Sequence, residues 1–314
     1  MSSEPSGPLQ FSVIMPIFNR APYVGEAIQS VVRQTWPHWE LIIVDDGSTD
    51  STPAILDRWA APDARIIVLH QKNVGAATAR NAAIACARRP WLAYIDSDDL
   101  WFPDALEQYA RYIAAHPQAR FIHGYANRLR EDGAVKQAAG DFQDRATGTA
   151  ELFGRMFLCP LGVCHRRELL DLAGRFDESL PSTEDYDLYL RMSLHCRLEP
   201  LGRPVGLRRR HATNISRQTG PSRLLEAEIL SRFAGEHGRE AGLSPQAVRR
   251  RLGFLYYAAG RQFFKAGCYR EAIAAIRESR RYRRTFKGEA VALAAGILRP
   301  LQKRTAARSA TANR

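Results

Sequence analysis

The fold of this chain is decided by residues 11–46, which read FSVIMPIFNRAPYVGEAIQSVVRQTWPHWELIIVDD. The two ends of this stretch, 11–17 and 40–46, are rich in Val, Ile and Leu and lack polar alternation, whereas 22–35 has a helical pattern. Continuous apolar runs of this length are typical of strands buried on both faces of a parallel sheet. The stretch therefore predicts a strand, a helix and a second, parallel strand.

The same alternation continues downstream. Apolar runs at 65–70 and 91–96 predict two more strands, and 52–60 and 76–88 predict helices, the first with Ser and Thr caps and Pro53 in its opening turn. This order indicates an α/β fold, a mixed sheet flanked by helices. Beyond residue 100 the pattern predicts a helix at 104–115, a strand at 120–130 and a loop-rich stretch to 150. Three more helices are predicted at 150–157, 167–173 and 185–195.

Acidic residues follow two of the predicted strands. Asp45 and Asp46 end the second strand, and Asp96, Asp98 and Asp99 end the fourth. Open α/β sheets bind ligands outside the carboxyl ends of their strands, so these positions predict a binding site.

The cluster in WLAYIDSDDLWFP, residues 91–103, has two interpretations. If the segment is extended, Asp96 and Asp98 share a face opposite Asp99. Two carboxylates on one side suit Mg²⁺ or Mn²⁺, which a substrate diphosphate would help to hold. Alternatively, the segment is a solvated acidic turn that caps the helix after Pro103.

Two further motifs point to nucleotide binding. Asp45-Asp46-Gly47 could accept hydrogen bonds from a base or ribose, or could be an ordinary Asp-Gly turn. Gly75 precedes a helix that carries Arg80, an arrangement that suits an anion such as a diphosphate. Neither GxxxxGK[ST] nor GxGxxG occurs, which argues against a P-loop NTPase and a dinucleotide-binding Rossmann site.

A last acidic pair opens the helix in FDESLPSTEDYDLYLRMSL, residues 176–194. Glu184 and Asp185 could be first-turn acids that the helix dipole favours. In the sharper interpretation, one of them is a general base.

Four stretches of the chain, taken in order, resemble the inverting glycosyltransferase family 2. They are residues 12–52, NVGAATARN, YIDSDDLWFP and GRFDESLPSTEDYDLYLRM, and the resemblance covers roughly residues 9–215. The resemblance implies the GT-A fold, a nucleoside-diphosphate sugar donor, a hydroxyl acceptor and a Mn²⁺ or Mg²⁺ cofactor. It implies Asp185 as the catalytic base and a metal site of Asp98, Asp96 and His211. The positions implied to line the nucleotide pocket are Pro16, Phe18, Asp45, Asp46, Gly75, Arg80, Asp96 and Ser97.

The basic charge is concentrated near the C-terminus. Residues 201–314 hold 25 of the 45 Lys and Arg but only 7 of the 33 Asp and Glu. A helix near 289–298, with Val291, Ala294, Ala295 and Leu298 on one face, could lie on an anionic membrane or pack on the protein. A basic tail of this density could also bind nucleic acid, which would make the protein a nucleic-acid-binding module, although the sequence contains no recognisable nucleic-acid-binding motif. A nucleotidyltransferase is a third alternative, in which the Glu184-Asp185 pair would have no task.

These observations define the expected organisation. We expect a flexible N-terminus at 1–9, a GT-A domain at 10–219, a helical extension at 220–302 and a disordered basic tail at 303–314. No apolar run approaches the roughly 20 residues that cross a bilayer, and the five cysteines lack metal-site spacing. The expected location is cytoplasmic, at most peripheral on the inner membrane face. The resemblance favours a UDP-sugar donor and a saccharide or lipid-linked acceptor in bacterial surface polysaccharide or glycolipid synthesis.

Overall fold

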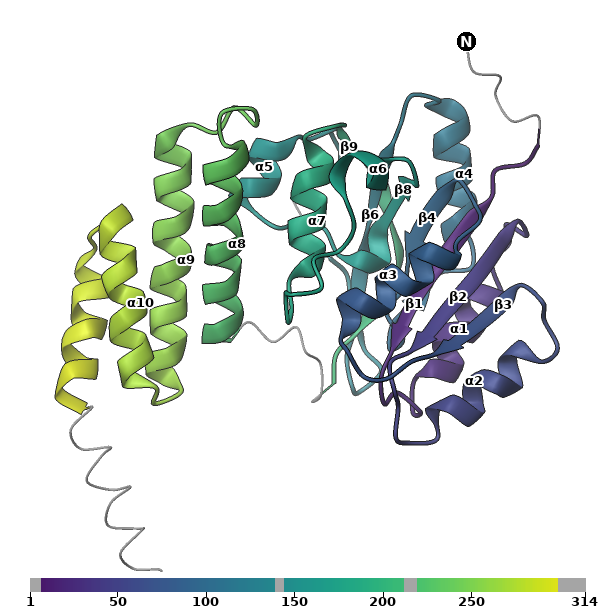
Figure 1. Cartoon of the computed structure of the whole chain (residues 1–314), viewed down its shortest axis with the longest axis horizontal. Coiled ribbons are helices and arrows are strands. Elements are labelled where there is room, and N and C mark those ends of the chain that lie inside the picture. The colour runs from purple at the N-terminus through teal and green to yellow at the C-terminus, as the bar shows by residue number, and fades with distance from the viewer. Residues whose placement is uncertain (1–6, 139–143, 212–218, 299–314) are drawn as a thin grey trace, which may run out of the picture. The chain divides into compact units, whose positions relative to one another are not determined.

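The computed structural model describes residues 7–138, 144–211 and 219–298, and it divides into two compact units (Figure 1). The first unit covers Met1–Asn214 and the second covers Ile215–Arg314. The predicted terminal segments 1–9 and 303–314 lie wholly or largely outside the described residues.

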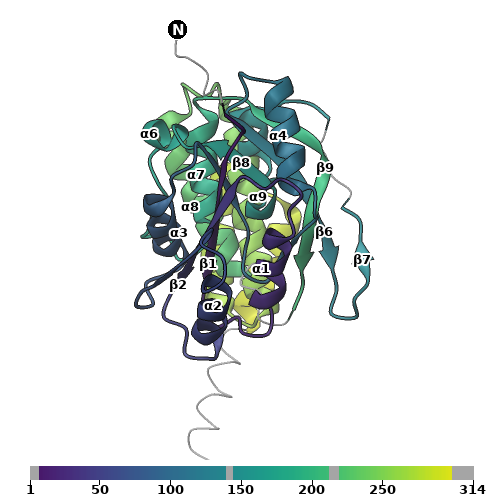
Figure 2. The same cartoon turned by 90° about the vertical axis from the view of Figure 1, so that its right-hand side faces the viewer.

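The first unit is built on a mixed sheet with the strand order β3-β2-β1-β4-β8-β6-β9-β5, and β7 pairs with the outer part of β6 (Figure 2). The first four strands are parallel, as the apolar runs predict. β8 is antiparallel to both β4 and β6, whereas β6 and β9 are parallel. The bounds are β1 Phe11–Ile17, β2 Trp39–Asp45, β3 Ile66–His70, β4 Trp91–Tyr94, β5 Leu100–Trp101, β6 Phe121–Leu129, β7 Val135–Lys136, β8 Val163–Arg166 and β9 Leu198–Arg209.

Helices cover both faces of this sheet, which explains why its strands are apolar on both sides. Side chains of α1, α2 and α4 share one core with alternate residues of β1 and β2, such as Val13 and Leu41. The intervening residues Ser12 and Glu40 face the other way and are hydrogen-bonded to each other at 2.7 Å, next to the segment that follows α3. The helices are α1 Val24–Val32, α2 Thr52–Ala60, α3 Ala76–Cys86, α4 Ala105–Ala115, α5 Thr149–Gly154, α6 Leu169–Ala173 and α7 Glu184–Ser193.

The predicted cap of α2 needs a correction. Pro53 does lie in the first turn, but no Ser or Thr side chain caps the helix. Instead Asp50 accepts a hydrogen bond from the backbone N–H of Thr52 at 2.9 Å, because its carboxylate reaches two residues ahead.

The second unit is helical, with α8 Gly220–His237, α9 Pro245–Lys265, α10 Tyr269–Tyr282 and a further helix over 286–298. The helices predicted for the C-terminal part of the chain are thus present in the described residues 219–298. The small core of this unit contains Ala259, Phe263, Ala272, Ala275 and Ala295. α9 and α10 approach closely at Gly260, where an added Cβ would come within 2.7 Å of Ile276. In the parts of the chain that the structure describes, no helix is long and apolar enough to span a membrane.

Candidate active site

The acidic cluster after β4 forms a turn. The backbone N–H of Asp99 donates to the carbonyl of Asp96 at 3.0 Å, so residues 96–99 are not extended. The expectation that Asp96 and Asp98 share a face by strand alternation is therefore wrong in its premise. The turn sends each of the three carboxylates to a different set of partners.

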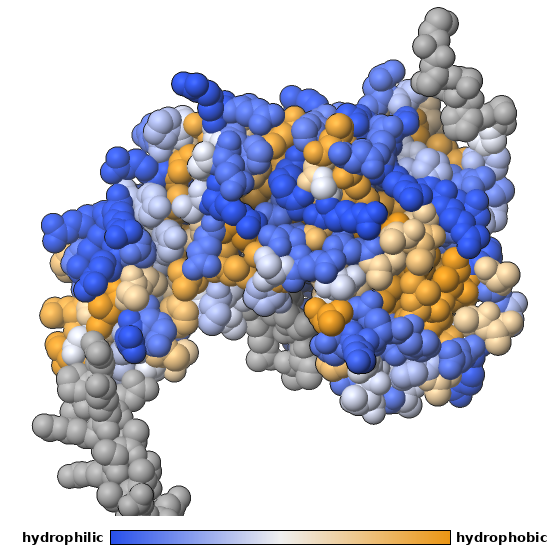
Figure 3. All heavy atoms as spheres, viewed as in Figure 1, coloured by the Kyte–Doolittle hydropathy of each residue, from blue (hydrophilic) through white to orange (hydrophobic). Residues whose placement is uncertain are grey.

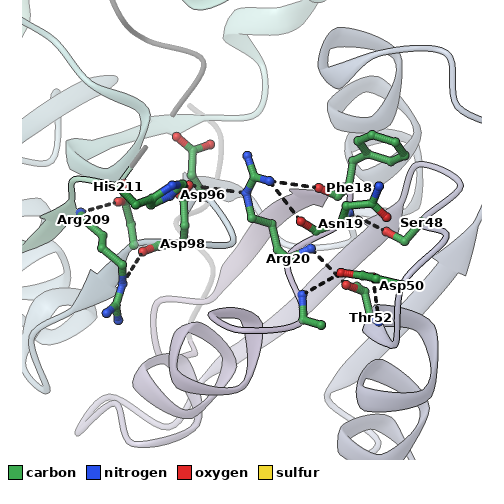
Figure 4. A network of polar contacts seen from close by, with 12 residues as sticks. Phe18, Asn19, Arg20, Ser48, Asp50, Thr52, Asp96, Asp98, Arg209 and His211 are labelled. Carbon is green, nitrogen blue, oxygen red and sulfur yellow. Dashed lines mark hydrogen bonds and ion pairs between the residues drawn. The ribbon is translucent and has the colours of Figure 1, made fainter. Parts of the chain in front are cut away.

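Asp98 faces the histidine that follows β9. Its Oδ2 lies 2.8 Å from Nε2 of His211 and 3.5 Å from Nε of Arg20 (Figure 4). The His211 ring is stacked on Tyr23, with 4.6 Å between the ring centroids. Arg209 donates from Nε to the backbone carbonyl of Asp98 at 3.1 Å. Segments from three distant parts of the sequence thus meet at Asp98.

Asp96 instead belongs to a buried ion-pair chain. Arg80 on α3 donates to Oδ1 of Asp96 at 2.8 Å and also to Oε1 of Glu184, the first residue of α7. The guanidinium lies 5.6 Å from the centroid of the Phe176 ring. Carboxylates on both sides raise the pKa of Arg80 despite its burial, so it is always charged. Arg80 therefore fixes the start of α7 relative to the turn after β4.

Asp99 is the most deeply buried member of the turn. Its Oδ1 accepts a hydrogen bond from the backbone N–H of Arg209 at 2.9 Å, which ties β9 to the turn. Burial, together with the charges of Asp96 and Asp98, raises the pKa of Asp99 well above its ordinary value.

The two acids at the start of α7 differ in environment. Glu184 is buried and paired with Arg80, whereas Asp185 is half-buried and makes no ion pair with any residue that the structure describes. Burial and the neighbouring Glu184 charge raise the pKa of Asp185 to about 6, against an opposing effect of Arg80. The N-cap residue Thr183 has φ 66°, a left-handed conformation that non-glycine residues seldom adopt. A strained entry into α7 is thus maintained beside Asp185.

The carboxylates after β2 are used inside the protein. Asp45 accepts hydrogen bonds from the backbone N–H of Ser48 and from His70, each at 3.0 Å. Asp45 also raises the pKa of His70.

Asp46 holds the loop that leads to α3. It accepts from Gln71 at 2.7 Å and from the backbone N–H groups of Val74 and Gly75 at 2.9 and 2.8 Å. Gly47 has φ 77°, and a Cβ there would lie 2.8 Å from the backbone nitrogen of Asn73. In the structure, therefore, the Asp46 carboxylate supports the backbone ahead of α3.

The remaining predicted pocket residues lie around these loops. Pro16 is the sixth residue of β1, and Phe18, which follows the strand, is 42% exposed. Asn19 joins this loop to the next one, because its backbone N–H donates to Oγ of Ser48 at 2.8 Å (Figure 4). Its side-chain oxygen also accepts from the backbone N–H of Thr49 at 2.8 Å. Ser97 is buried within the 96–99 turn.

The three predicted metal ligands do not converge on one point. In the described ranges no group of three or more His, Cys, Asp or Glu side chains is arranged to hold a metal. Asp98 and His211 contact each other, while Asp96 is engaged by Arg80. A carboxylate and an imidazole still fit a Mn²⁺ or Mg²⁺ ion whose other ligands are substrate phosphates and water.

Several site residues were not anticipated. Arg20, Tyr23 and Arg209 surround Asp98, and Arg208 and Tyr189 lie in electrostatic range of Asp185. The RRRH sequence at 208–211 could have indicated part of this set. Consecutive residues of a strand point to opposite faces, so an arginine of this sequence would face the interior of the domain.

Comparison with known proteins assigns this domain. The sequence model of the family described as Glycosyl transferase family 2 matches residues 12–160. These residues form a glycosyltransferase family 2 domain, which confirms the resemblance for the three motif stretches that lie within 12–160. The fourth stretch, which holds Glu184 and Asp185, lies beyond the matched residues.

Individual relatives agree. The putative teichuronic acid biosynthesis glycosyltransferase TuaG of Bacillus subtilis is 42% identical over 123 residues, which are 39% of this chain and 48% of TuaG. The glycosyltransferase GlyG of Streptococcus pneumoniae is 36% identical over 39% of this chain and 41% of its own length. The matches thus cover less than half of these curated relatives.

Solved structures confirm the fold. Residues 1–349 of S. aureus TarS in complex with UDP-GlcNAc superpose with a TM-score of 0.60 at 19% identity, covering 94% of this chain and 92% of that one. The mannosyltransferase PcManGT of Pyrobaculum calidifontis, in complex with GDP-Man and Mn²⁺, superposes with a TM-score of 0.57 at 20% identity, covering 95% of this chain and 82% of that one. The predicted GT-A architecture with C-terminal helices is therefore correct.

Proposed function

We propose that this protein is a metal-dependent inverting glycosyltransferase that moves a sugar from a nucleoside-diphosphate donor to a hydroxyl acceptor. The observation that carries the proposal is the contrast within the acidic pair of α7. Glu184 is neutralised by Arg80, and Asp185 beside it is half-buried without an ion-pair partner among the described residues. A carboxylate with a raised pKa suits general-base chemistry, and Asp185 belongs to the same compact unit as the family 2 match over residues 12–160.

In this proposal Asp185 removes the proton of the acceptor hydroxyl while that oxygen attacks the anomeric carbon. Inversion follows because one displacement occurs, on the face opposite the leaving group. Arg80 contributes by holding α7 to the turn after β4, so that the base keeps its position relative to the donor site.

Asp98 and His211 are the proposed holders of a divalent cation. When bound, that cation would offset the negative charge that develops on the departing nucleoside diphosphate. Asp96 and Ser97 belong to the same turn and are proposed to contact the donor's ribose side. The pocket for the nucleotide base is proposed to be formed by the loops that contain Pro16, Phe18, Asp45, Asp46 and Gly75. Asp45 and Asp46 would act indirectly, through the backbone N–H groups that their carboxylates bind.

The donor is proposed to be a UDP-sugar, in keeping with the UDP-GlcNAc bound by TarS, although PcManGT was solved with GDP-Man. The test is to incubate the full chain with Mn²⁺ and a panel of UDP-, GDP- and dTDP-sugars and to identify what is released. Nucleoside diphosphate supports glycosyl transfer. Release of pyrophosphate from a nucleoside triphosphate and a sugar phosphate would instead support the nucleotidyltransferase alternative.

We also propose that the second unit contacts an anionic membrane surface that carries the acceptor. The face predicted for this contact is wrong, because Ala295 is fully buried in the unit's own core and Val291, Ala294 and Leu298 are partly buried. Another stripe of the same helix is open: Phe286 is 89% exposed, Leu293 69% and Ile297 63%.

This open stripe lies next to cationic side chains. Arg281, Arg283, Arg284 and Lys287 are exposed around its first turn. Apolar and strongly hydrophilic surface accordingly meet over the C-terminal helices at the left of Figure 3. Exposed apolar side chains flanked by Lys and Arg are typical of helices that lie on anionic lipid.

A further inference from the structure

The last residues of β9 present two arginines to opposite sides. Arg208 and Arg209 are consecutive strand residues, so their side chains point to opposite faces. Arg209 is fully engaged, with Glu26 and with the carbonyl of Asp98. The position of this strand segment is tightly fixed, because an added Cβ at Gly206 would lie 2.2 Å from the carbonyl oxygen of Leu100 on β5. The direction of Arg208 is therefore set by the fold.

Arg208 is a half-buried cation without a fixed counter-ion. It makes no ion pair and no side-chain hydrogen bond with any residue in the ranges that the structure describes. The acidic groups in electrostatic range are Cys159, Asp99, Asp96 and Asp185. Two of these are already committed, Asp96 to Arg80 and Asp99 to the backbone of Arg209. Partial burial of a charge is costly unless the charge is paired, so a cation in this setting is ready for an anionic ligand.

The location of Arg208 indicates which ligand. The proposed metal pair, Asp98 and His211, lies with Arg20, Tyr23 and Arg209, on the side to which the Arg209 side chain points. Arg208 points away from that side, and the acidic groups in electrostatic range of its guanidinium are, in decreasing order of effect, Cys159, Asp99, Asp96 and Asp185. If Asp185 is the base, the region beside it receives the acceptor hydroxyl, whereas the diphosphate belongs with Asp98.

We propose that Arg208 binds an anionic group, a phosphate or a carboxylate, carried by the acceptor next to its reacting hydroxyl. This inference rests on the proposed function, because it uses Asp185 to locate the acceptor. The acceptor class is thereby narrowed to an acidic saccharide or a sugar or polyol phosphate. Arginine suits such a group because its planar guanidinium can donate two parallel hydrogen bonds to one phosphate or carboxylate.

The test compares matched anionic and neutral probes on the full chain in the presence of UDP and Mn²⁺. The pairs are methyl glucuronide with methyl glucoside and glycerol phosphate with glycerol, with binding followed by ligand-observed NMR. The variants are Arg208→Gln and Arg208→Lys, and Arg203→Gln serves as the control because Arg203 is an exposed arginine of the same strand. Affinity for UDP is measured for each protein as well.

We expect the wild-type protein and Arg203→Gln to prefer at least one anionic probe over its neutral partner by about tenfold or more, the scale of one charge-assisted hydrogen bond. Arg208→Gln should lose that preference and Arg208→Lys should keep part of it, with UDP affinity unchanged in both. A preference that is absent from the wild-type protein, or equal in Arg208→Gln, would overturn the inference. So would a loss of UDP affinity in Arg208→Gln, since the anion would then be the donor's diphosphate.

These outcomes are separable from the fate of the proposed function. Release of nucleoside diphosphate from a sugar nucleotide with water as acceptor needs no acidic acceptor. Its absence would count against glycosyl transfer, while the probe preference would still report on the anion site.

Discussion

Nε2 of His211 and Oδ2 of Asp98 lie 2.8 Å apart although 113 residues separate them in the chain. The stacking of Tyr23 on the imidazole and the contact of Arg20 with the same carboxylate limit the movement of both groups. A carboxylate and an imidazole held together in this way form two fixed ligands of a potential cation site.

The first prediction concerns this pair. Asp98→Ala should weaken Mn²⁺-dependent UDP binding by about tenfold to a hundredfold, because the cation that bridges protein and diphosphate loses a ligand. His211→Ala should produce a smaller loss in the same direction. Isothermal titration with UDP, with and without Mn²⁺, measures both.

The control for this experiment is Asp104→Asn, which removes an exposed carboxylate just before α4 and should leave the titration unchanged. Identical UDP affinity with and without Mn²⁺ in the wild-type protein would show that Asp98 and His211 hold no metal for the nucleotide.

The second prediction separates the two acids of α7. Asp185→Asn should lower transfer by about a hundredfold or more and leave UDP binding intact, since only the general base is lost. Glu184→Gln should instead destabilise the fold by about 3 kcal/mol, because it removes one of the two carboxylates that neutralise a buried guanidinium. Steady-state rates, UDP titrations and urea unfolding of both variants distinguish these effects. Unchanged turnover in Asp185→Asn would exclude Asp185 as the base.

The predictability of this fold from sequence depended on the length and composition of each strand. β1 to β4 were found because each lies in a short, largely apolar run next to a helical pattern. β5 and β7 have only two residues each, and β9 reads LEPLGRPVGLRR, with prolines, glycines and arginines that are unusual in a strand. β9 is stabilised by pairing with β6 and β5, and no local signal announces such long-range pairing.

The site was predicted in part, for a related reason. The motifs and the family resemblance singled out Arg80, Asp96, Asp98, Asp185 and His211 as candidates, but they could not say which of these residues are partners. Strand alternation suggested that Asp96 and Asp98 act together. The 96–99 turn separates them. Arg80 instead joins Asp96 to Glu184, which lies 104 positions after Arg80 in the chain. Ion pairs of this kind depend on how α3 and α7 pack, which a linear motif does not record.

The third prediction is a pH dependence. Asp185 acts as a base only when it is deprotonated, and its pKa of about 6 lies above the ordinary value of 3.8. The rate should therefore be constant well above pH 6 and fall toward about tenfold per pH unit below it, as the carboxyl takes up its proton. Initial rates of UDP release between pH 5 and 8, at saturating donor and Mn²⁺, give the profile. UDP binding over the same range serves as the control, since loss of binding would mimic the effect. A rate that stays constant down to pH 5 would contradict the assignment.

The last prediction tests the membrane contact of the second unit. Flotation of the full chain with vesicles of anionic phospholipid should recover the protein in the lipid fraction, and vesicles of neutral lipid should recover much less. The reason is that insertion of Phe286, Leu293 and Ile297 adds to the attraction between nearby arginines and the lipid charge. The double variant Phe286→Ser/Leu293→Ser should lose most of the binding without loss of folding, because both side chains are largely exposed. Leu172→Ser is the matched control, since Leu172 is a 53% exposed leucine of the first unit. If the double variant floats as well as the control, the stripe does not contact lipid, and binding by charge alone would be the remaining explanation.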